Sequence, residues 1–149
     1  MIQIDVRKQT LLLKNGRHEL LAEYPISTAK NGSGEKQGSE KTPRGAHVIA
    51  EKIGENMPIF TVFRARVPTD EIYSAELEKQ CPDRDWILSR ILWLNGSQTS
   101  LDRYIYIHGT HDEKNIGVPH SHGCIRMRNQ DVIDLFERVE VGQNVLIKE

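Results

Sequence analysis

Apolar and polar residues alternate over much of the chain, which is the period of a β-strand with one buried face. Residues 2–6 alternate in this way at the start of the chain. The stretch LLLKNGRHELL (11–21) places a Lys-Asn-Gly turn between two apolar runs, a pattern typical of a β-hairpin. The segments AHVIAEKI (46–53) and IFTVFRARV (59–67) alternate again. The first two-thirds of the chain therefore predicts largely short strands.

The pattern changes further along the chain. In DRDWILSRILWLNG (83–96) the apolar residues recur with a helical spacing, which predicts a short amphipathic helix that ends at Asn-Gly. RYIYIHG (103–109) predicts a strand that ends at a histidine, and NVLIK (144–148) predicts a last strand. Between them, QDVIDLFERV predicts a helix with Asn129 as its N-cap. The apolar face of that helix consists of Val132, Leu135, Phe136 and Val139.

The order of these elements predicts the fold class. No internal repeat and no interdomain linker stands out, and the Gly-, Ser- and Lys-rich segment 30–45 is typical of a flexible loop within a domain. A length of 149 residues fits one domain. We therefore expect residues 1–149 to form a single α+β domain, dominated by an antiparallel β-sheet or small barrel, with a few short helices.

Composition and charge exclude several classes of protein. The chain is 38% hydrophobic and 28% charged, as is usual for soluble globular proteins. A net charge of −1 provides no basic field for nucleic acid, and no run of 18 apolar residues predicts a membrane span. The first ten residues lack the basic and apolar regions of a signal peptide, so we expect a cytoplasmic protein, or a periplasmic one if a leader has been removed.

Two polar segments, IHGTHDE (107–113) and PHSHGCIRM (119–127), carry the candidate chemistry. Cys124 could be a nucleophile, which requires a base within hydrogen-bond reach and a third group that orients the base. His108 stands at the end of a predicted strand, where a rigid scaffold fixes geometry, and the carbonyl of Gly109 could fix its tautomer. Backbone N–H groups around Gly123 and Cys124 could line an oxyanion hole.

Other interpretations of the same residues remain open at this point. A lone cysteine is often a small buried hydrophobe, and a histidine at a strand end is often structural. We expect two loop histidines, His111 and His120, to be solvated. A disulfide between Cys81 and Cys124 does not fit a cytosolic chain. A zinc site is also conceivable, although the spacing matches no common motif; its candidate ligands are His108, His111, Asp112, His120, His122 and Cys124.

One family combines these features. IHG followed by SHGCIRM resembles the signature of the L,D-transpeptidase (YkuD) catalytic domain, in which a histidine and a spacer precede Ser/Thr-His-Gly-Cys. His108 and Cys124 are 16 positions apart, which is within the range of that family. YPISTAK (24–30), TPRG (42–45) and the closing DVIDLFERVEVGQNVLI (131–147) are similar as well, so the resemblance covers nearly the whole chain.

The resemblance implies a role for each site residue. Cys124 is the nucleophile, and His108 is the general base that the carbonyl of Gly109 orients. Arg126, where the family has Arg or Asn, either holds a substrate carboxylate bidentately or braces the loop. No metal or organic cofactor is required. The resemblance assigns substrate-binding and oxyanion roles to Ser121, His122, Gly123 and Arg126.

The resemblance also implies a substrate, a peptidoglycan stem tetrapeptide, whose bond between the L-centre of diaminopimelate and D-Ala is cleaved through a thioester. Water as acceptor makes an L,D-carboxypeptidase, whereas an amine makes 3–3 cross-links or exchanges D-amino acids. Without a leader or a peptidoglycan-binding module, the chain is similar to short cytoplasmic L,D-carboxypeptidases of wall recycling, which favours hydrolysis of soluble muropeptides. Acylation by a carbapenem is also implied. Remote alternatives are a zinc hydrolase and a non-catalytic muropeptide-binding domain. We expect residues 67–98 to form one wall of the substrate groove.

Overall fold

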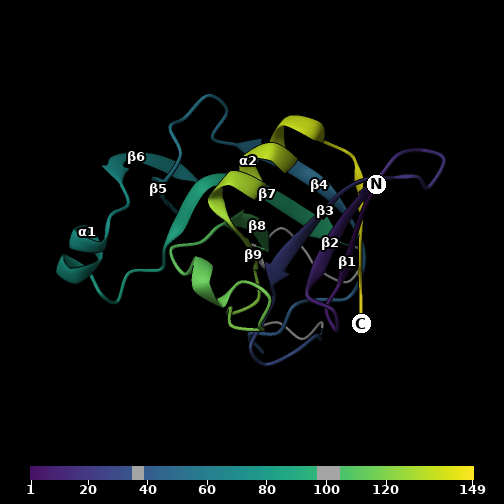
Figure 1. Ribbon diagram of the computed structural model, residues 1–149, viewed down its shortest axis with the longest axis horizontal. Coiled ribbons are helices and arrows are strands. Elements are labelled where there is room, and N and C mark those ends of the chain that lie inside the picture. The colour runs from purple at the N-terminus through teal and green to yellow at the C-terminus, as the bar shows by residue number, and fades with distance from the viewer. Residues whose placement is uncertain (35–38, 97–104) are drawn as a thin grey trace.

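The computed structural model describes residues 1–34, 39–96 and 105–149 (Figure 1). Within these ranges the strands are β1 (Ile2–Asp5), β2 (Thr10–Lys14), β3 (Leu20–Ser27), β4 (Gly45–Ile53), β5 (Thr61–Arg64), β6 (Val67–Ile72), β7 (Ile87–Gly96), β8 (Tyr106–Gly109), β9 (Ile125–Met127) and β10 (Asn144–Lys148). The helices are α1 (Ala75–Gln80), α2 (Asn129–Arg138) and a 3-10 turn, η2 (Glu113–Asn115).

The strands form one sheet that closes into a barrel. Their order is β4-β10-β1-β2-β3-β9-β8-β7, and a further pairing of β7 with β4 joins the two ends. Neighbours are antiparallel except for β1 with β10 and β8 with β9, which run parallel. The hairpin of β5 and β6 continues the sheet from the start of β7, and in Figure 1 it projects to one side with α1. The barrel, dominated by antiparallel pairs, confirms the predicted fold class.

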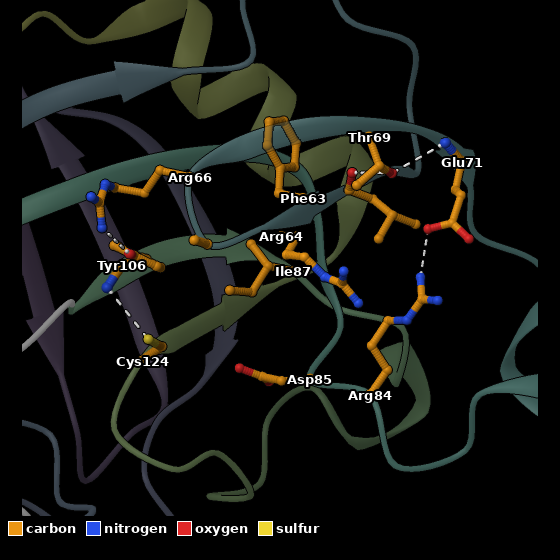
Figure 2. Close-up of a pocket in the computed structure, with 12 residues that line it drawn as sticks. Phe63, Arg64, Arg66, Thr69, Glu71, Arg84, Asp85, Ile87, Tyr106 and Cys124 are labelled. Atoms are coloured by element: carbon orange, nitrogen blue, oxygen red, sulfur yellow. Dashed lines mark hydrogen bonds and ion pairs between the residues drawn. The ribbon is translucent and has the colours of Figure 1, made fainter.

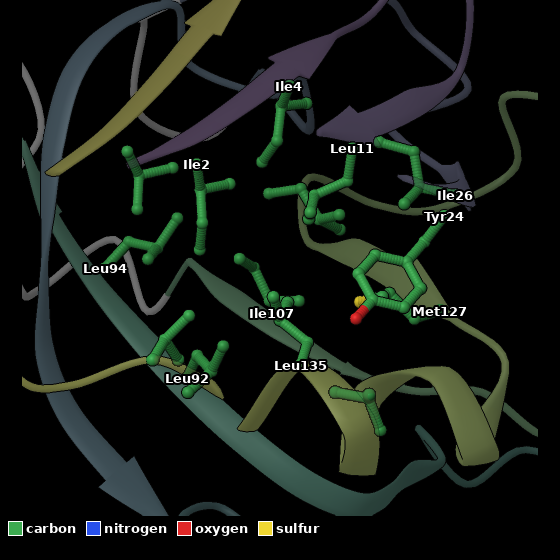
Figure 3. Packing of buried hydrophobic residues seen from close by; sticks show 14 of the residues in the cluster. Ile2, Ile4, Leu11, Tyr24, Ile26, Leu92, Leu94, Ile107, Met127 and Leu135 are labelled. Carbon is green, nitrogen blue, oxygen red and sulfur yellow. The ribbon is translucent and has the colours of Figure 1, made fainter. Parts of the chain in front are cut away.

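The main hydrophobic core fills the barrel. Alternate residues of the strands point inward, so that Ile2 and Ile4 of β1 are completely buried with Leu11 and Leu13 of β2 (Figure 3). Burying one such side chain contributes about 1.5–3 kcal/mol to folding. The apolar face of α2 packs on the same core, as its sequence pattern predicts. The barrel therefore supplies a rigid support for the strand ends that carry polar residues.

The helix predicted over residues 83–96 is wrong, because most of this segment is strand β7. Leu92 and Leu94 face the barrel core, while Ile87 and Ile91 belong to a second apolar cluster on the other face. A strand that is covered on both faces has a continuous run of apolar residues, instead of alternating apolar and polar residues. A bulge also interrupts its pairing with β8 between Leu88 and Ile91, which disturbs the strand period further.

The predicted cap of α2 is also wrong. Arg128 occupies the N-cap position without a side-chain hydrogen bond, and Asn129 is the first residue of the helix. The side chain of Asn129 turns inward and is fully buried. Neither α2 nor any other helix among the described residues is long and apolar enough to cross a bilayer.

Candidate active site

The pairing of β8 with β9 places the candidate nucleophile and base on one face of the sheet. His108 lies opposite Arg126 in this parallel pair. Cys124 directly precedes β9, and its Sγ accepts a hydrogen bond of 3.4 Å from the backbone N–H of Tyr106. Because side chains alternate along a strand, Cys124, Tyr106 and His108 share the face opposite to the barrel core. From strand spacing, the Cβ atoms of His108 and Cys124 lie about 8 Å apart, a gap that a thiol and an imidazole can span.

The imidazole of His108 is held in one tautomer. Its Nδ1 lies 2.7 Å from the carbonyl oxygen of Gly109 and therefore carries the hydrogen, which leaves Nε2 as the acceptor. The ring is almost fully buried, and this burial lowers the pKa of His108 to about 4. The Gly109 carbonyl and the carboxylate of Asp85 raise the pKa, and the charges of Arg126 and His111 lower it. At neutral pH His108 is therefore uncharged and able to accept a proton.

The Ser-His-Gly-Cys turn is held together by its own serine. The Ser121 hydroxyl donates to the carbonyl of Cys124 at 2.6 Å and accepts from the N–H of Gly123 at 3.2 Å. Gly123 has φ +132, a conformation that residues with a side chain rarely adopt. His122 is largely exposed, with its Nδ1 3.5 Å from Glu40. Ser121 thus shapes the turn. For Gly123 to stabilise an oxyanion, its N–H would have to break the hydrogen bond to the Ser121 hydroxyl.

A buried threonine supports the same turn, and it was not singled out from the sequence. The Thr42 hydroxyl donates to the carbonyl of Gly123 at 2.9 Å and accepts from the N–H of Ala29 at 2.9 Å. Thr28, also fully buried, accepts from the N–H of Ser121 through its carbonyl oxygen. Both threonines lie in segments that carry the family resemblance, Thr42 in TPRG and Thr28 in YPISTAK. Their structural role is to hold the cysteine turn against β3.

A cavity of about 780 Å³ opens beside the thiol (Figure 2). Its walls come from β5, the β5–β6 turn, β6, the segment before β7, Tyr106 and Cys124. Thr69, Glu71 and Asp85 place part of the 67–98 segment in the wall of this cavity, together with Ile87 at the start of β7, whereas the rest of β7 belongs to the barrel. That this wall belongs to a substrate groove stays a prediction. Residues 97 and 98 lie outside the described residues.

Charged side chains line this cavity from end to end. In Figure 2, Cys124 lies at one end and the ion pair of Arg84 with Glu71, 2.6 Å long, at the other, with Arg64 and Asp85 between them. Arg66 lies over the ring of Trp93, 4.2 Å from its centroid, and donates to the Tyr106 hydroxyl at 3.3 Å. Two of the three arginines are thus engaged with protein groups, whereas Arg64 projects into the cavity.

The zinc interpretation finds no support among the residues that the structure describes. They contain no group of three or more His, Cys, Asp or Glu side chains that could hold a metal ion. His111 is half-buried against the rings of Tyr73 and Trp86, so the prediction that it is solvated is wrong. His120 is exposed, as predicted, 3.5 Å from Asp112. Neither Cys81 nor Cys124 forms a disulfide.

Comparison with known families agrees with this geometry. The profile of the YkuD family, the L,D-transpeptidase catalytic domain, matches residues 1–147. The chain belongs to this family. The cysteine turn and the buried histidine described above therefore belong to an L,D-transpeptidase catalytic domain. Proteins of this family act in peptidoglycan metabolism and depend on a cysteine.

Individual L,D-transpeptidases are similar over parts of the chain. YqjB of Bacillus subtilis, whose name assigns it provisionally to the L,D-transpeptidases, is 45% identical over 56 residues, 37% of this chain and 32% of that protein. An L,D-transpeptidase of Mycobacterium smegmatis shares the fold with a TM-score of 0.65 at 19% identity, over 99% of this chain and 58% of the other. A structure of LdtMt1 in complex with imipenem gives a TM-score of 0.60 at 18% identity, over 99% of this chain and 57% of the other. The chain thus spans less than two thirds of these relatives.

Proposed function

We propose that this chain cleaves the bond between the L-centre of diaminopimelate and the terminal D-Ala of peptidoglycan stem tetrapeptides, through a thioester on Cys124. The observation that carries the proposal is the position of Cys124 and His108 on one face of two adjacent parallel strands, beside the cavity. The Nδ1 hydrogen bond to Gly109 fixes the imidazole ring, which supports the proposed role of His108 as the base that activates the thiol.

The first half-reaction transfers the acyl group to sulfur. His108 accepts the thiol proton at Nε2 while Sγ of Cys124 attacks the carbonyl carbon of the L-centre. The tetrahedral intermediate collapses as the C–N bond breaks, and the D-Ala amine leaves with the proton from His108. One residue thus serves first as base and then as acid. A neutral histidine suits this sequence, since a histidine that was already protonated could not accept the thiol proton.

Two arginines can bind the carboxylates of the substrate. Arg64 projects into the cavity between Cys124 and the Arg84 ion pair, where an extended peptide bound at the thiol would pass. Arg126 of β9 lies on the same face of the sheet as Cys124, and its charge lowers the pKa of His108. Guanidinium groups bind carboxylates bidentately, which fixes orientation as well as affinity. We assign the terminal D-Ala carboxylate to Arg126 and a carboxylate further along the peptide to Arg64.

Water is the acyl acceptor in the reaction that we propose, so the chain acts as an L,D-carboxypeptidase. Departure of D-Ala leaves space in the solvent-open cavity next to the thioester, and a water there needs no binding site of its own. His108 accepts a proton from that water and returns it to sulfur as the thioester breaks. Soluble muropeptides and wall-attached tetrapeptides are both substrates on this basis.

An amine acceptor is the second candidate, because one observation favours it. The Asp85 carboxylate lines the cavity, and in Figure 2 it lies between Arg64 and Cys124. A carboxylate near the thioester could bind the ammonium group of an incoming diaminopimelate or D-amino acid. The product would then be a 3–3 cross-link or an exchanged D-amino acid.

Mass spectrometry of the purified protein with a disaccharide tetrapeptide, with and without free D-Met, tests the proposal. We expect tripeptide as the main product in both mixtures, no product with Cys124→Ala, and normal turnover with Cys81→Ala. Incorporation of D-Met or formation of dimers as the main product would instead establish a transpeptidase. Turnover that survives Cys124→Ala would contradict the cysteine mechanism altogether.

A carbapenem supplies a second test that is independent of the acceptor. The mycobacterial structures include a faropenem-derived adduct of an L,D-transpeptidase. We expect imipenem to add its mass to the wild-type chain and to Cys81→Ala, but not to Cys124→Ala. Peptide mapping should place the adduct on Cys124.

A further inference from the structure

A buried polar cluster lies directly behind the catalytic histidine. Asn129, which is completely buried, accepts a hydrogen bond of 2.7 Å at Oδ1 from the hydroxyl of Ser89. Its Nδ2 donates to the carbonyl of Thr110 at 2.8 Å and to the Glu113 carboxylate at 2.9 Å. One amide side chain thus joins the bulge of β7, the end of β8 and the turn that follows it.

The β7 partner of this amide is held in an unusual conformation. Ser89 is fully buried at φ +71, inside the bulge of β7 where pairing with β8 shifts. Its hydroxyl also accepts from the N–H of Phe60 at 2.9 Å. A left-handed serine costs of order 1 kcal/mol or more and persists only where its surroundings impose it. Such strain often marks a position with a functional constraint.

The cluster touches the residue that orients the base. A Cβ on Gly109 would lie 2.6 Å from the carbonyl oxygen of Leu88 and still closer to Oδ1 of Asn129, so the Gly109 backbone fits tightly between β7 and the amide. The following N–H, that of Thr110, donates to Met127 of β9 at 3.1 Å. The peptide group between Gly109 and Thr110 is therefore fixed in its plane. Its carbonyl oxygen is the one that accepts from Nδ1 of His108.

We propose that Asn129, anchored by Ser89, is a positioning residue for the general base: it holds the Gly109–Thr110 peptide so that the Gly109 carbonyl keeps His108 in the tautomer with Nε2 toward the thiol. The inference rests on the proposed function of His108 as the base. It assigns to Asn129 a role beyond the start of α2, because its amide contributes three hydrogen bonds to segments outside that helix.

The groups around His108 determine what loss of this support would do. Asp85 from the segment before β7 raises the pKa of His108, and Arg126 from β9 and His111 after β8 lower it. Burial is the largest influence and lowers the pKa. If the Gly109 carbonyl moves, the ring loses the hydrogen bond that fixes its tautomer and raises its pKa, so we expect a mixture of tautomers and titration at still lower pH.

Histidine side-chain 15N NMR of Asn129→Ala and Ser89→Ala, compared with wild type, tests the proposal directly. In wild type we expect His108 to show a protonated Nδ1 and an unprotonated Nε2, with titration near pH 4. In both variants we expect a mixture of tautomers and titration at lower pH, with the smaller change in Ser89→Ala. On tetrapeptide, kcat should fall by about 10- to 100-fold with KM little changed.

Val132→Ala is the matched control, because Val132 is also buried in α2 and belongs to the apolar cluster that fills the barrel. It should lower thermal stability and leave the tautomer, the titration and kcat unchanged. Folded Asn129→Ala or Ser89→Ala protein whose His108 signals match wild type would overturn the proposal. If wild type does not cleave the tetrapeptide, the proposed function fails, while the NMR comparison still decides whether Asn129 positions His108.

Discussion

The ring of His108 donates through Nδ1 to the carbonyl oxygen of Gly109, 2.7 Å away and one residue along the chain. A backbone carbonyl takes the place that a carboxylate has in many catalytic triads. Because a carbonyl carries no full charge, it stabilises the imidazolium less than a carboxylate would. The effect of burial is therefore larger than that of this hydrogen bond, and it holds the pKa of His108 at about 4.

The first prediction concerns the pH dependence of activity. The base must be neutral, so kcat/KM should fall on acidification with a midpoint near pH 4, well below the value of about 6.5 for an exposed histidine. The Asp85 carboxylate raises the pKa of His108, so Asp85→Asn should move this midpoint to lower pH. The measurement is a pH–rate profile of tetrapeptide cleavage; a midpoint near 6.5 would contradict the assigned state of His108.

The same histidine should make stability depend on pH. The unfolded chain binds a proton at His108 below about pH 6.5, whereas the folded chain does so only near pH 4. The free energy of unfolding should therefore decrease as the pH falls from 6.5 to 4, by on the order of 3 kcal/mol from this residue. Urea titrations of wild type and His108→Gln across this range measure the difference. Parallel curves for the two proteins would show that burial of the ring has no such effect.

Gly109 should tolerate no side chain. In Gly109→Ala the new Cβ overlaps the Leu88 carbonyl and the Asn129 amide, and a backbone atom cannot move aside as a flexible side chain can. We expect a loss of 1–3 kcal/mol in unfolding free energy, about the usual cost of overpacking, together with reduced activity of the folded fraction. Gly16→Ala is the control, since no atom beyond its two chain neighbours lies within 4 Å of its Cβ position. Equal stability and activity of the two variants would refute the close packing behind His108.

Thr42 should matter for the cysteine turn. Thr42→Val removes the hydroxyl that donates to Gly123 and leaves the N–H of Ala29 without this acceptor, at a cost of about 1–3 kcal/mol. Thr61→Val is matched, because Thr61 is equally buried and donates to the carbonyl of Pro58, away from the turn. Denaturant unfolding should show a loss of stability in both variants. Only Thr42→Val should also lower the rate of tetrapeptide cleavage, and equal rates would argue against a role in the turn.

Arg126→Gln should change binding and pH dependence together. Loss of the guanidinium should raise KM for the tetrapeptide, and loss of its charge should raise the pKa of His108 and move the acidic midpoint upward. Arg128→Gln removes the same charge from an exposed residue two positions on and should change neither quantity. Steady-state kinetics over pH distinguish the cases: a shifted midpoint with an unchanged KM would mean that Arg126 only braces the loop.

Local pattern was sufficient for much of this fold. The hairpin around Lys14–Gly16 appears as β2 and β3, and the apolar face of α2 packs where its period predicts. These elements depend on neighbours a few residues away, and such information is present in a short stretch of sequence. Cys124 and His108 were likewise recognisable, because their motif is contiguous except for a short spacer.

Tertiary structure decided the rest. Segment 87–96 is a strand because partners from distant parts of the chain cover both of its faces and pair with both of its edges, which no local period reveals. Asn129 is part of the support behind the base rather than a cap, because the bulge of β7 brings Ser89 to its amide. The sequence by itself predicted which residues carry the chemistry. Only the parallel pairing of β8 with β9 determined that they lie on the same face of the sheet, because side-chain direction follows from strand register.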